Sequence, residues 1–196
     1  MRMMKTIFGA NSKLTRASDK ELMLLVTKDN NHHAFRKLYE RLSEKLYRFI
    51  YYIVLDESVA QEITHEAFLT LYDKRKMYRS DYQVSTWLWT IGRNKAYDYK
   101  KKKKEISIDD EIIISLPNDD ISTLQKLAQE ASSETIKEAL KLLPDSQRDA
   151  ILLWMDDYNT KEMAEIMEKS EQAIKNLINR AKMKLKEVLE GRMESI

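Results

Sequence analysis

Hydrophobic residues recur three or four positions apart through most of the chain, which is the spacing of one buried face of an α-helix. In the N-terminal half this spacing predicts a short helix over about 19–28 and a long one after the Asn30-Asn31 pair. A third helix should follow Asp56, and a fourth should be capped by Ser85.

The C-terminal half carries helix-start signals of its own. Pro144 stands at a helix start, and Asn159 with Glu162 has the spacing of a capping box, as do Ser18 and Glu21 near the N-terminus. A break at 168–170 then precedes a long final helix. Its hydrophobic stripe consists of Ile174, Leu177, Ile178, Ala181, Leu185 and Val188.

Residues 105–130 lack a sustained helical period. Pro117 disfavours helix at the residue before it, so we interpret this stretch as a flexible acidic linker with a possible short helix from about Ser122. The sequence therefore predicts an all-α chain of two small helical domains. The predicted order is an N-terminal tail (1–17), a first domain (18–104), the linker (105–130), a second domain (131–190) and a C-terminal tail (191–196).

Composition excludes most catalytic chemistry. Three Gly residues among 196 argue against glycine-rich phosphate cradles and hairpin-rich β folds, which need backbone positions with positive φ. The absence of Cys excludes disulfides and thiolate zinc sites and fits a reducing compartment. We find no signal peptide and no apolar run near the roughly 20 residues that span a bilayer. We expect a soluble, cytoplasmic protein.

The formal net charge of +2 conceals strong segregation along the chain. Residues 1–17 sum to +4 and residues 18–104 to +6, whereas residues 105–130 sum to −6 and residues 131–196 to −2. The sharpest change follows the five lysines at 100–104. Charge asymmetry of this kind suggests that one part of the chain binds an anion.

The final helix offers one candidate anion-binding face. Residues 172–186 carry 5 bases and no acids, and a helical wheel gathers amides and cations opposite the hydrophobic stripe. Amide side chains pair with adenine edges, and Lys and Arg meet guanine or phosphate, so a helix-turn-helix that reads DNA fits these residue types. An ordinary amphipathic helical hairpin is the alternative. The face comprises Gln172, Lys175, Asn176, Asn179 and Lys186, with Arg180 at its edge.

The fourth helix offers a second candidate face. The wheel predicts a buried stripe of Val84, Trp87, Leu88 and Ile91 that continues into Asn94, Lys95 and Asp98. The opposite face would present Trp89, Arg93 and Lys100, an aromatic and two cations suited to nucleic acid. The alternative is a solvated helix end with its tryptophans in the core. From the residues, both interpretations stay open.

A metal centre and a hydrolase are disfavoured. Glu62 and His65 have the Glu-x-x-His spacing of di-iron bundles, which need a second such pair and two more inward Glu residues. The only near match joins Asp29 to His32 at a predicted helix break. No Ser-His-Asp arrangement can be named either. We expect no cofactor, no metal and no enzymatic activity.

Taken together, the motifs resemble the extracytoplasmic-function group of bacterial sigma factors over about 18–104 and 133–190. In the first domain the resemblance rests on 60–69, on 86–94 with Asp98, and on the lysines that follow. In the second it rests on 143–148, 162–164, 173–176 and Arg180-Ala181.

The resemblance implies that the first domain docks on core RNA polymerase and opens the −10 promoter element. The family's polymerase-facing Asp-x-x-Gln-Glu positions fall on Glu62, His65 and Glu66, so Glu replaces Asp and His replaces Gln here. A loop at 78–83 and the fourth helix would handle the unpaired strand. Its candidate residues are Tyr78, Arg79, Trp89, Arg93, Lys100 and Lys101. Asn94 and Asp98 match the family, but we favour a structural, hydrogen-bonded role for them.

The resemblance further implies that the final helix enters the major groove of the −35 element, with Gln172, Lys175, Asn176, Asn179 and Arg180 as its contacts. The acidic linker would cross the polymerase near its active-site channel, and an anti-sigma factor would be a further partner. Glu168 replaces the family's usual turn glycine. Two alternatives stay open: a stand-alone helix-turn-helix regulator that dimerises on duplex DNA, and a helical adaptor without a DNA role.

Overall fold

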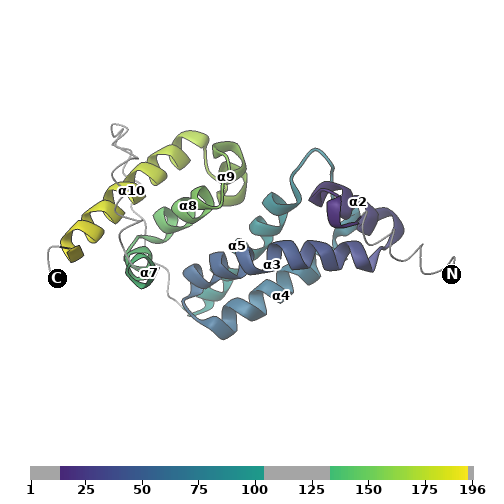
Figure 1. Cartoon of the computed structure of the whole chain (residues 1–196), viewed down its shortest axis with the longest axis horizontal. Helices are drawn as coiled ribbons and strands as arrows, with labels where there is room; N and C mark the ends of the chain where they lie inside the picture. Colours follow the sequence, from purple (N-terminus) through teal and green to yellow (C-terminus); the bar gives the residue numbers. More distant parts are fainter. Residues whose placement is uncertain (1–13, 104–132, 194–196) are drawn as a thin grey trace. The chain divides into compact units, whose positions relative to one another are not determined.

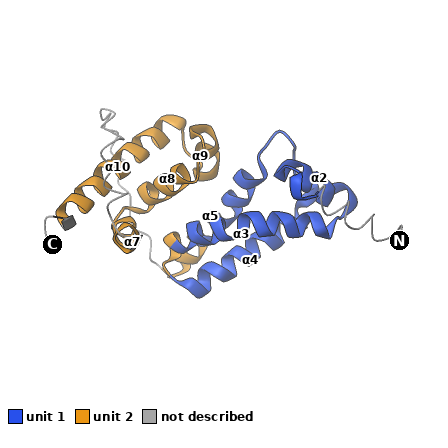
Figure 2. Cartoon of the chain, viewed as in Figure 1, with its two compact units in different colours: residues 1–51, 56–96 blue, residues 52–55, 97–196 orange. Residues whose placement is uncertain are grey.

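The computed structural model describes residues 14–103 and 133–193, which form two compact units (Figures 1 and 2). Within these residues every regular element is a helix, which confirms the predicted all-α class. Unit 1 comprises residues 1–51 and 56–96, and unit 2 comprises residues 52–55 and 97–196. The predicted linker and the possible helix from Ser122 lie outside the described residues, as do residues 1–13 and 194–196 of the predicted tails.

Unit 1 contains α2 (Asp19–Asp29), most of α3 (His32–Val54), α4 (Glu57–Asp73), a 3₁₀ turn η1 (Arg75–Met77) and the first part of α5 (Val84–Lys103). The helix order is the predicted one, although α5 begins one residue before Ser85.

Two of the three helix caps predicted for unit 1 form as expected. The Glu21 backbone N–H donates to the Ser18 hydroxyl at 3.3 Å, and the Ser18 backbone N–H donates to the Glu21 carboxylate at 2.7 Å. The Ser18 backbone N–H, and then the Ser18 hydroxyl, which donates to the same carboxylate at 2.8 Å, lower the pKa of Glu21. The Asp56 carboxylate accepts from the Val59 backbone N–H at 3.0 Å and caps α4. The caps at Ser18 and Asp56 are therefore confirmed. The predicted Ser85 cap is wrong, because α5 begins at Val84 and Ser85 lies within the helix.

The core of unit 1 forms where α2, α3, α4 and α5 bury their hydrophobic faces. Gly92 permits a close approach of α5 to α3, because a Cβ atom there would lie 2.9 Å from Leu46 Cδ1 and 3.2 Å from Ile50 Cδ1. The largest fully buried side chains of this core are Leu22, Met23, Leu38, Leu46, Ile50, Phe68, Leu71, Leu88 and Trp89.

Unit 2 contains α7 (Ser133–Lys141), α8 (Asp145–Met155), α9 (Thr160–Met167) and α10 (Glu171–Met193). As predicted, α8 starts directly after Pro144, and Asn159 and Glu162 close a capping box at 2.9 and 3.0 Å. Helix α10 packs against α7, α8 and α9. Its predicted stripe faces inward: Ile174, Ile178, Ala181 and Leu185 are buried, and Leu177 and Val188 are half-buried.

The turn between α9 and α10 forms without glycine. Glu168 adopts the left-handed conformation (φ 56°, ψ 43°) that glycine usually supplies after a helix. The Lys169 N–H donates to the Ala164 carbonyl at 3.1 Å, and the Ser170 hydroxyl then caps α10 by accepting from the Ala173 N–H at 3.1 Å. The helix-turn-helix geometry therefore survives the substitution of the turn glycine by Glu168.

Glu168→Gly should stabilise the protein, because a left-handed backbone costs an L-residue on the order of 1 kcal/mol and costs glycine little. Glu165→Gly, within α9, is the matched control and should destabilise by about 1 kcal/mol because glycine is a poor helix former. The free energy of unfolding from urea titration followed by circular dichroism measures both. Changes of the same sign would contradict the assignment of Glu168 as the strained turn residue.

Candidate nucleic-acid interface

The outer face of α10 gathers the polar side chains that the sequence predicts for DNA. Gln172 and Lys175 are exposed, and Asn176, Asn179 and Arg180 are half-buried. The Gln172 side-chain amide donates to the Asn176 side-chain carbonyl at 3.2 Å, which couples two amides one turn apart. Because the buried stripe of α10 packs on α7, α8 and α9, the rotation of this face about the helix axis is fixed.

Two further cations of α10, Lys182 and Lys184, are engaged elsewhere. The Lys182 ammonium lies 4.0 Å from the centre of the Trp154 ring, and burial there lowers the pKa of Lys182. Lys184 pairs with Glu187 at 3.0 Å. The residues predicted to read bases thus lie in the first turns of α10, the part of such helices that contacts base edges, and Lys186, predicted at the far end of the face, is half-buried.

The predicted outer face of α5 is wrong in two respects. Trp89 is fully buried, so it belongs to the core and does not offer its ring to a ligand. Asn94 and Asp98, assigned to the buried stripe, are exposed. The stripe is rotated because the small residues Gly92 and Ala96, both buried, mark the line of closest helix contact.

Lys100 also departs from the expected position. It is 7% exposed and pairs with Asp145 within unit 2, whereas the neighbouring Lys101 is exposed and Arg93 is half-buried. The last turn of α5 carries four lysines, which suits the negative end of the helix dipole.

The loop at 78–83 presents an aromatic and cationic surface. The Tyr78 ring stacks on Trp87 with 6.0 Å between centroids, and its hydroxyl donates to the Tyr82 carbonyl at 2.9 Å. Burial, followed by the charges of Asp81 and Asp19, raises the pKa of Tyr78. Arg79 donates to Asp81 at 3.0 Å and lies 5.6 Å from the Tyr82 ring centroid.

Tyr82 is a functional candidate that the sequence analysis missed. It is 45% exposed, and the hydrogen bond from Tyr78 to its carbonyl fixes the loop that carries it. An exposed aromatic ring beside a guanidinium is the kind of platform on which unpaired bases stack. Its place within a short polar loop, next to Arg79 and Asp81, was the available sequence signal.

On α4, the three residues predicted to face a protein partner lie together and exposed. Glu62, His65 and Glu66 occupy adjacent positions on one face, and Leu69, 62% exposed, extends that face by one turn. His65 stacks on Tyr39 of α3 with 6.1 Å between ring centroids and 9° between planes. Lys95 of α5 donates to Glu66 at 2.8 Å.

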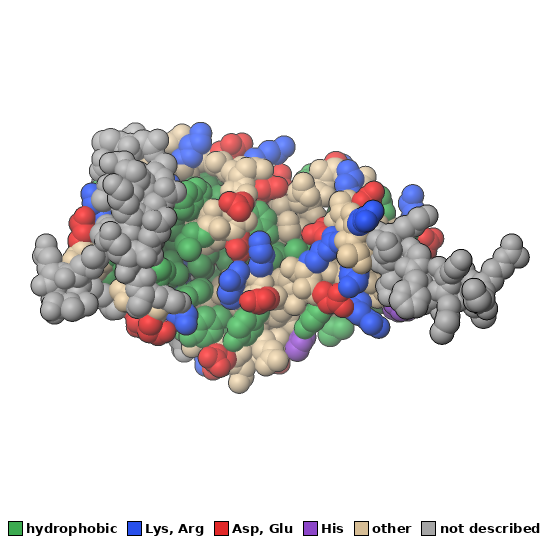
Figure 3. Space-filling model, viewed as in Figure 1, with side chains coloured by type: hydrophobic (Ala, Val, Ile, Leu, Met, Phe, Trp, Pro, Cys, Tyr) green, Lys and Arg blue, Asp and Glu red, His purple; other side chains and the backbone are tan. Residues whose placement is uncertain are grey.

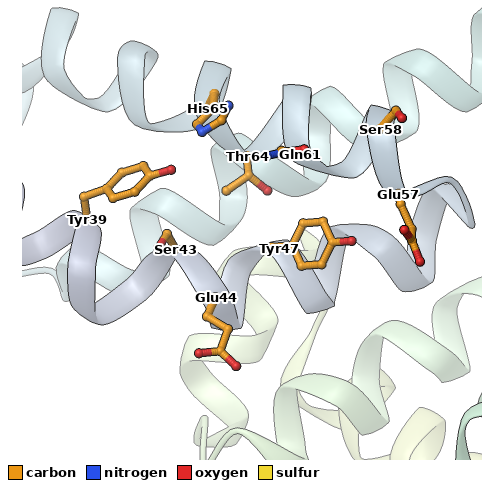
Figure 4. A pocket seen from close by; sticks show the side chains of 9 residues that line it. All are labelled: Tyr39, Ser43, Glu44, Tyr47, Glu57, Ser58, Gln61, Thr64 and His65. Atoms are coloured by element: carbon orange, nitrogen blue, oxygen red, sulfur yellow. The ribbon is translucent and has the colours of Figure 1, made fainter. Parts of the chain in front are cut away.

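A groove of about 390 Å³ runs beside this face, between α3 and α4 (Figure 4). In Figure 4, His65 lies beside the Tyr39 ring, and Tyr47 extends toward Glu57 at the opposite end. Burial, followed by the charge of Glu57, raises the pKa of Tyr47. The lining residues are Tyr39, Ser43, Glu44, Tyr47, Glu57, Ser58, Gln61, Thr64 and His65.

Surface charge in the view of Figure 3 is mixed, with Lys and Arg side chains interspersed among Asp and Glu. Within 14–103 and 133–193, no group of three His, Asp or Glu side chains could hold a metal ion. None of the helices in those ranges is long and apolar enough to cross a membrane.

Comparison with known protein families matches both halves of the chain. The model of sigma-70 region 2 matches residues 38–106, and that of sigma-70 region 4 matches residues 133–185. The extracytoplasmic-function (ECF) RNA polymerase sigma factor SigM of Bacillus subtilis is 31% identical over 153 residues, which span 76% of this chain and 91% of SigM.

The chain belongs to the ECF sigma factors of the sigma-70 family.

Two further relatives place the chain in the same group. The ECF sigma factor BldN of Streptomyces coelicolor is 32% identical over 76% of this chain and 57% of its own length. SigW of Bacillus subtilis is 26% identical over 83% of this chain and 92% of its own length.

Solved structures share the fold of this sigma factor. CnrH, solved with the cytosolic domain of CnrY, superposes with a TM-score of 0.64 at 20% identity and covers 88% of this chain and 97% of its own. RpoE of Bartonella quintana, solved with the anti-sigma factor NepR, gives 0.62 at 20% identity over 80% of this chain and 96% of its own. Both confirm a fold of helical domains.

Burial of Trp89 in this sigma factor predicts a stability effect. Trp89→Ala should lower the free energy of unfolding by about 3–5 kcal/mol, because it empties a large core site. Trp87→Ala, which removes a half-buried ring stacked on Tyr78, should cost clearly less. Urea titration followed by circular dichroism gives both values. Equal losses, or a larger loss for Trp87→Ala, would contradict the core assignment.

Proposed function

We propose that this sigma factor binds core RNA polymerase in the cytoplasm, recognises the −35 and −10 promoter elements and directs transcription initiation without itself catalysing a reaction. The observation that carries the proposal is the acid-free face of amides and cations on α10, held in a helix-turn-helix within a chain that matches both sigma-70 regions. Sigma factors are regulatory proteins that catalyse no reaction, and the absence of Cys and scarcity of Gly agree with such a role.

Recognition of the −35 element is assigned to α10. Placed in the major groove, Gln172, Asn176 and Asn179 would read base edges, and Lys175 and Arg180 would meet guanine or phosphate. The hydrogen bond between Gln172 and Asn176 holds both amides in one orientation before DNA arrives, which lowers the entropy cost of reading.

Handling of the unpaired −10 strand is assigned to the loop at 78–83 and the exposed part of α5. Tyr78 supports Tyr82 as a stacking platform, and Arg79, Arg93 and Lys101 supply cations for phosphate. Trp89 contributes to this surface only indirectly, because its buried ring holds α5 in position.

Docking on core RNA polymerase is assigned to Glu62, His65 and Glu66, which share one exposed face of α4. The carboxylates of Glu62 and Glu66 favour a basic partner surface. Stacking on Tyr39 limits the rotamers of His65, so the change from the family's Gln keeps a fixed polar group at this position.

An anti-sigma factor is a further proposed partner. Two proteins of this fold were solved in complexes: CnrH with the cytosolic domain of CnrY, and the sigma factor RpoE with the anti-sigma factor NepR. The groove between α3 and α4 borders the proposed polymerase face, so a protein seated there would compete with polymerase.

Run-off transcription with purified core polymerase, over a library of upstream sequences, tests the function. We expect transcripts that depend on this protein and share two promoter elements. A stand-alone regulator would instead bind duplex DNA as a dimer without polymerase. Absence of any protein-dependent transcript, with the polymerase shown competent by a sigma factor of known activity, would overturn the proposal.

Asn176→Ala should weaken recognition of a single −35 base pair by about 1–3 kcal/mol, because one amide pairs with one base edge. Met183→Ala, on the same helix and 42% exposed, is the control and should leave selection unchanged. Sequencing of transcripts from the promoter library measures preference at each position. An Asn176→Ala profile identical to that of the unmodified protein would remove Asn176 from the reading face.

A further inference from the structure

A buried charged cluster joins the end of α5 to the start of α8 within unit 2. Lys100 pairs with Asp145, and the Tyr97 hydroxyl donates to the Asp149 carboxylate at 2.8 Å. Exposed fractions are 7% for Lys100, 7% for Asp145 and 0% for Asp149. Charged side chains are rarely buried to this degree unless they are paired, so the contact is specific.

The two pairs are in register. Tyr97 and Lys100 lie three residues apart and therefore share one face of α5, and Asp145 and Asp149 lie four apart and share one face of α8. The later residue on α5 meets the earlier residue on α8, so the two helix segments run in opposite directions past one another.

Asp145 has a second cationic partner on its own helix. The Arg148 guanidinium pairs with Asp145 and also donates to the Leu143 carbonyl at 3.2 Å. Arg148 is 3% exposed. If Lys100 leaves, Asp145 therefore keeps a buried counter-charge, and Asp149, relieved of Tyr97, becomes open to water. Release of α5 therefore leaves neither Asp145 nor Arg148 as a buried charge without a partner.

We propose that this cluster is an internal latch. The Asp145 carboxylate binds the Lys100 ammonium at the place where a DNA phosphate would otherwise bind it. The end of α5 therefore binds a nucleic-acid strand only after Lys100 and Asp145 have separated. The proposal rests on the proposed function, in which the end of α5 belongs to the strand-binding surface. A carboxylate and a phosphate oxygen compete for the same ammonium, and the burial of Lys100 excludes simultaneous contact.

The closed latch keeps the phosphate backbone of a DNA strand away from Lys100. Lys101, Lys102 and Lys103 are exposed on the same turn, so a strand drawn to them would arrive beside Lys100. Apparent affinity of the closed protein for that strand is reduced by the fraction of molecules that are open.

The test measures binding of a fluorescently labelled, mixed-sequence DNA single strand to the free full-length protein. Asp145→Asn removes the competing charge but keeps Lys100, and we expect binding at least about tenfold tighter at low salt. Tyr97→Phe loosens the latch without touching Asp145 or Arg148, and should tighten binding to a smaller extent. This second variant carries the test if Asp145→Asn fails to fold.

Two lysine variants separate the latch from simple charge effects. Lys100→Met opens the latch but also removes the cation that it releases, so we expect no gain in binding. Lys101→Met removes a neighbouring exposed cation and leaves the latch closed, so binding should weaken and lose about one unit of salt slope. A gain of equal size in Lys100→Met and Asp145→Asn would overturn the competition for phosphate.

The opening of the latch can be measured without DNA. The chain contains no Cys, so spin labels at Lys102→Cys and Gln147→Cys report the separation of α5 and α8 alone. We expect one short distance in the free protein and a longer, broader distribution in Tyr97→Phe and Lys100→Met.

An unchanged distance in both variants would overturn the latch, as would opening without tighter DNA binding by Tyr97→Phe. Failure of unmodified protein to support transcription would instead overturn the proposed function, because label distance and strand binding are measured without polymerase.

Discussion

The arrangement of the helices in unit 2 depends on buried polar contacts at the start of α8. Arg148 donates to the carbonyls of Leu143 (3.2 Å) and Lys141 (3.4 Å) and pairs with Asp145, so one guanidinium joins the end of α7 to the first turn of α8. Helix α10 packs on both of these helices. The orientation of the outer face of α10, which we propose reads DNA, therefore follows from a buried polar corner as well as from the hydrophobic stripe.

That corner also explains how one short segment serves two contacts. Asp145 accepts from a cation on its own helix and from one on α5, and both of its partners are buried. Replacement of such a cluster by apolar residues of similar volume often leaves stability unchanged or raises it, so the cluster is weak evidence for stability. Its value lies in register, because only one alignment of α5 on α8 satisfies both pairs.

Much of the fold could be predicted because its signals are local. A capping box needs two residues three positions apart, and those of Ser18 and Asn159 formed as predicted. The stripe of α10 was equally visible, since Ile174, Ile178 and Leu185 repeat at helical spacing. Comparison with known families then confirmed the sigma-factor resemblance.

The errors on α5 have a different cause. Small residues set the line of closest approach there, and Gly92 contributes nothing to a hydrophobic wheel although Leu46 Cδ1 would lie 2.9 Å from its Cβ. The wheel therefore pointed Trp89 outward. Burial of Lys100 was equally invisible, because its partner is 45 residues away in the chain and a lysine run indicates solvent. A contact between two charges that are far apart in the chain produces no periodic pattern in the sequence.

A polar contact suits a surface that must open. A hydrophobic interface between α5 and α8 would expose apolar area on separation, at a cost of about 25 cal/mol per Å², and would invite aggregation. Separation of Lys100 from Asp145 exposes groups that water and phosphate both solvate well, and Arg148 keeps the remaining carboxylate neutralised. Lys100 can therefore be buried when the latch is closed and bind a DNA phosphate when it is open. Opening exposes no apolar patch that would promote aggregation. This reversibility is a physical reason for placing a charge, rather than a leucine, at the last buried position of α5.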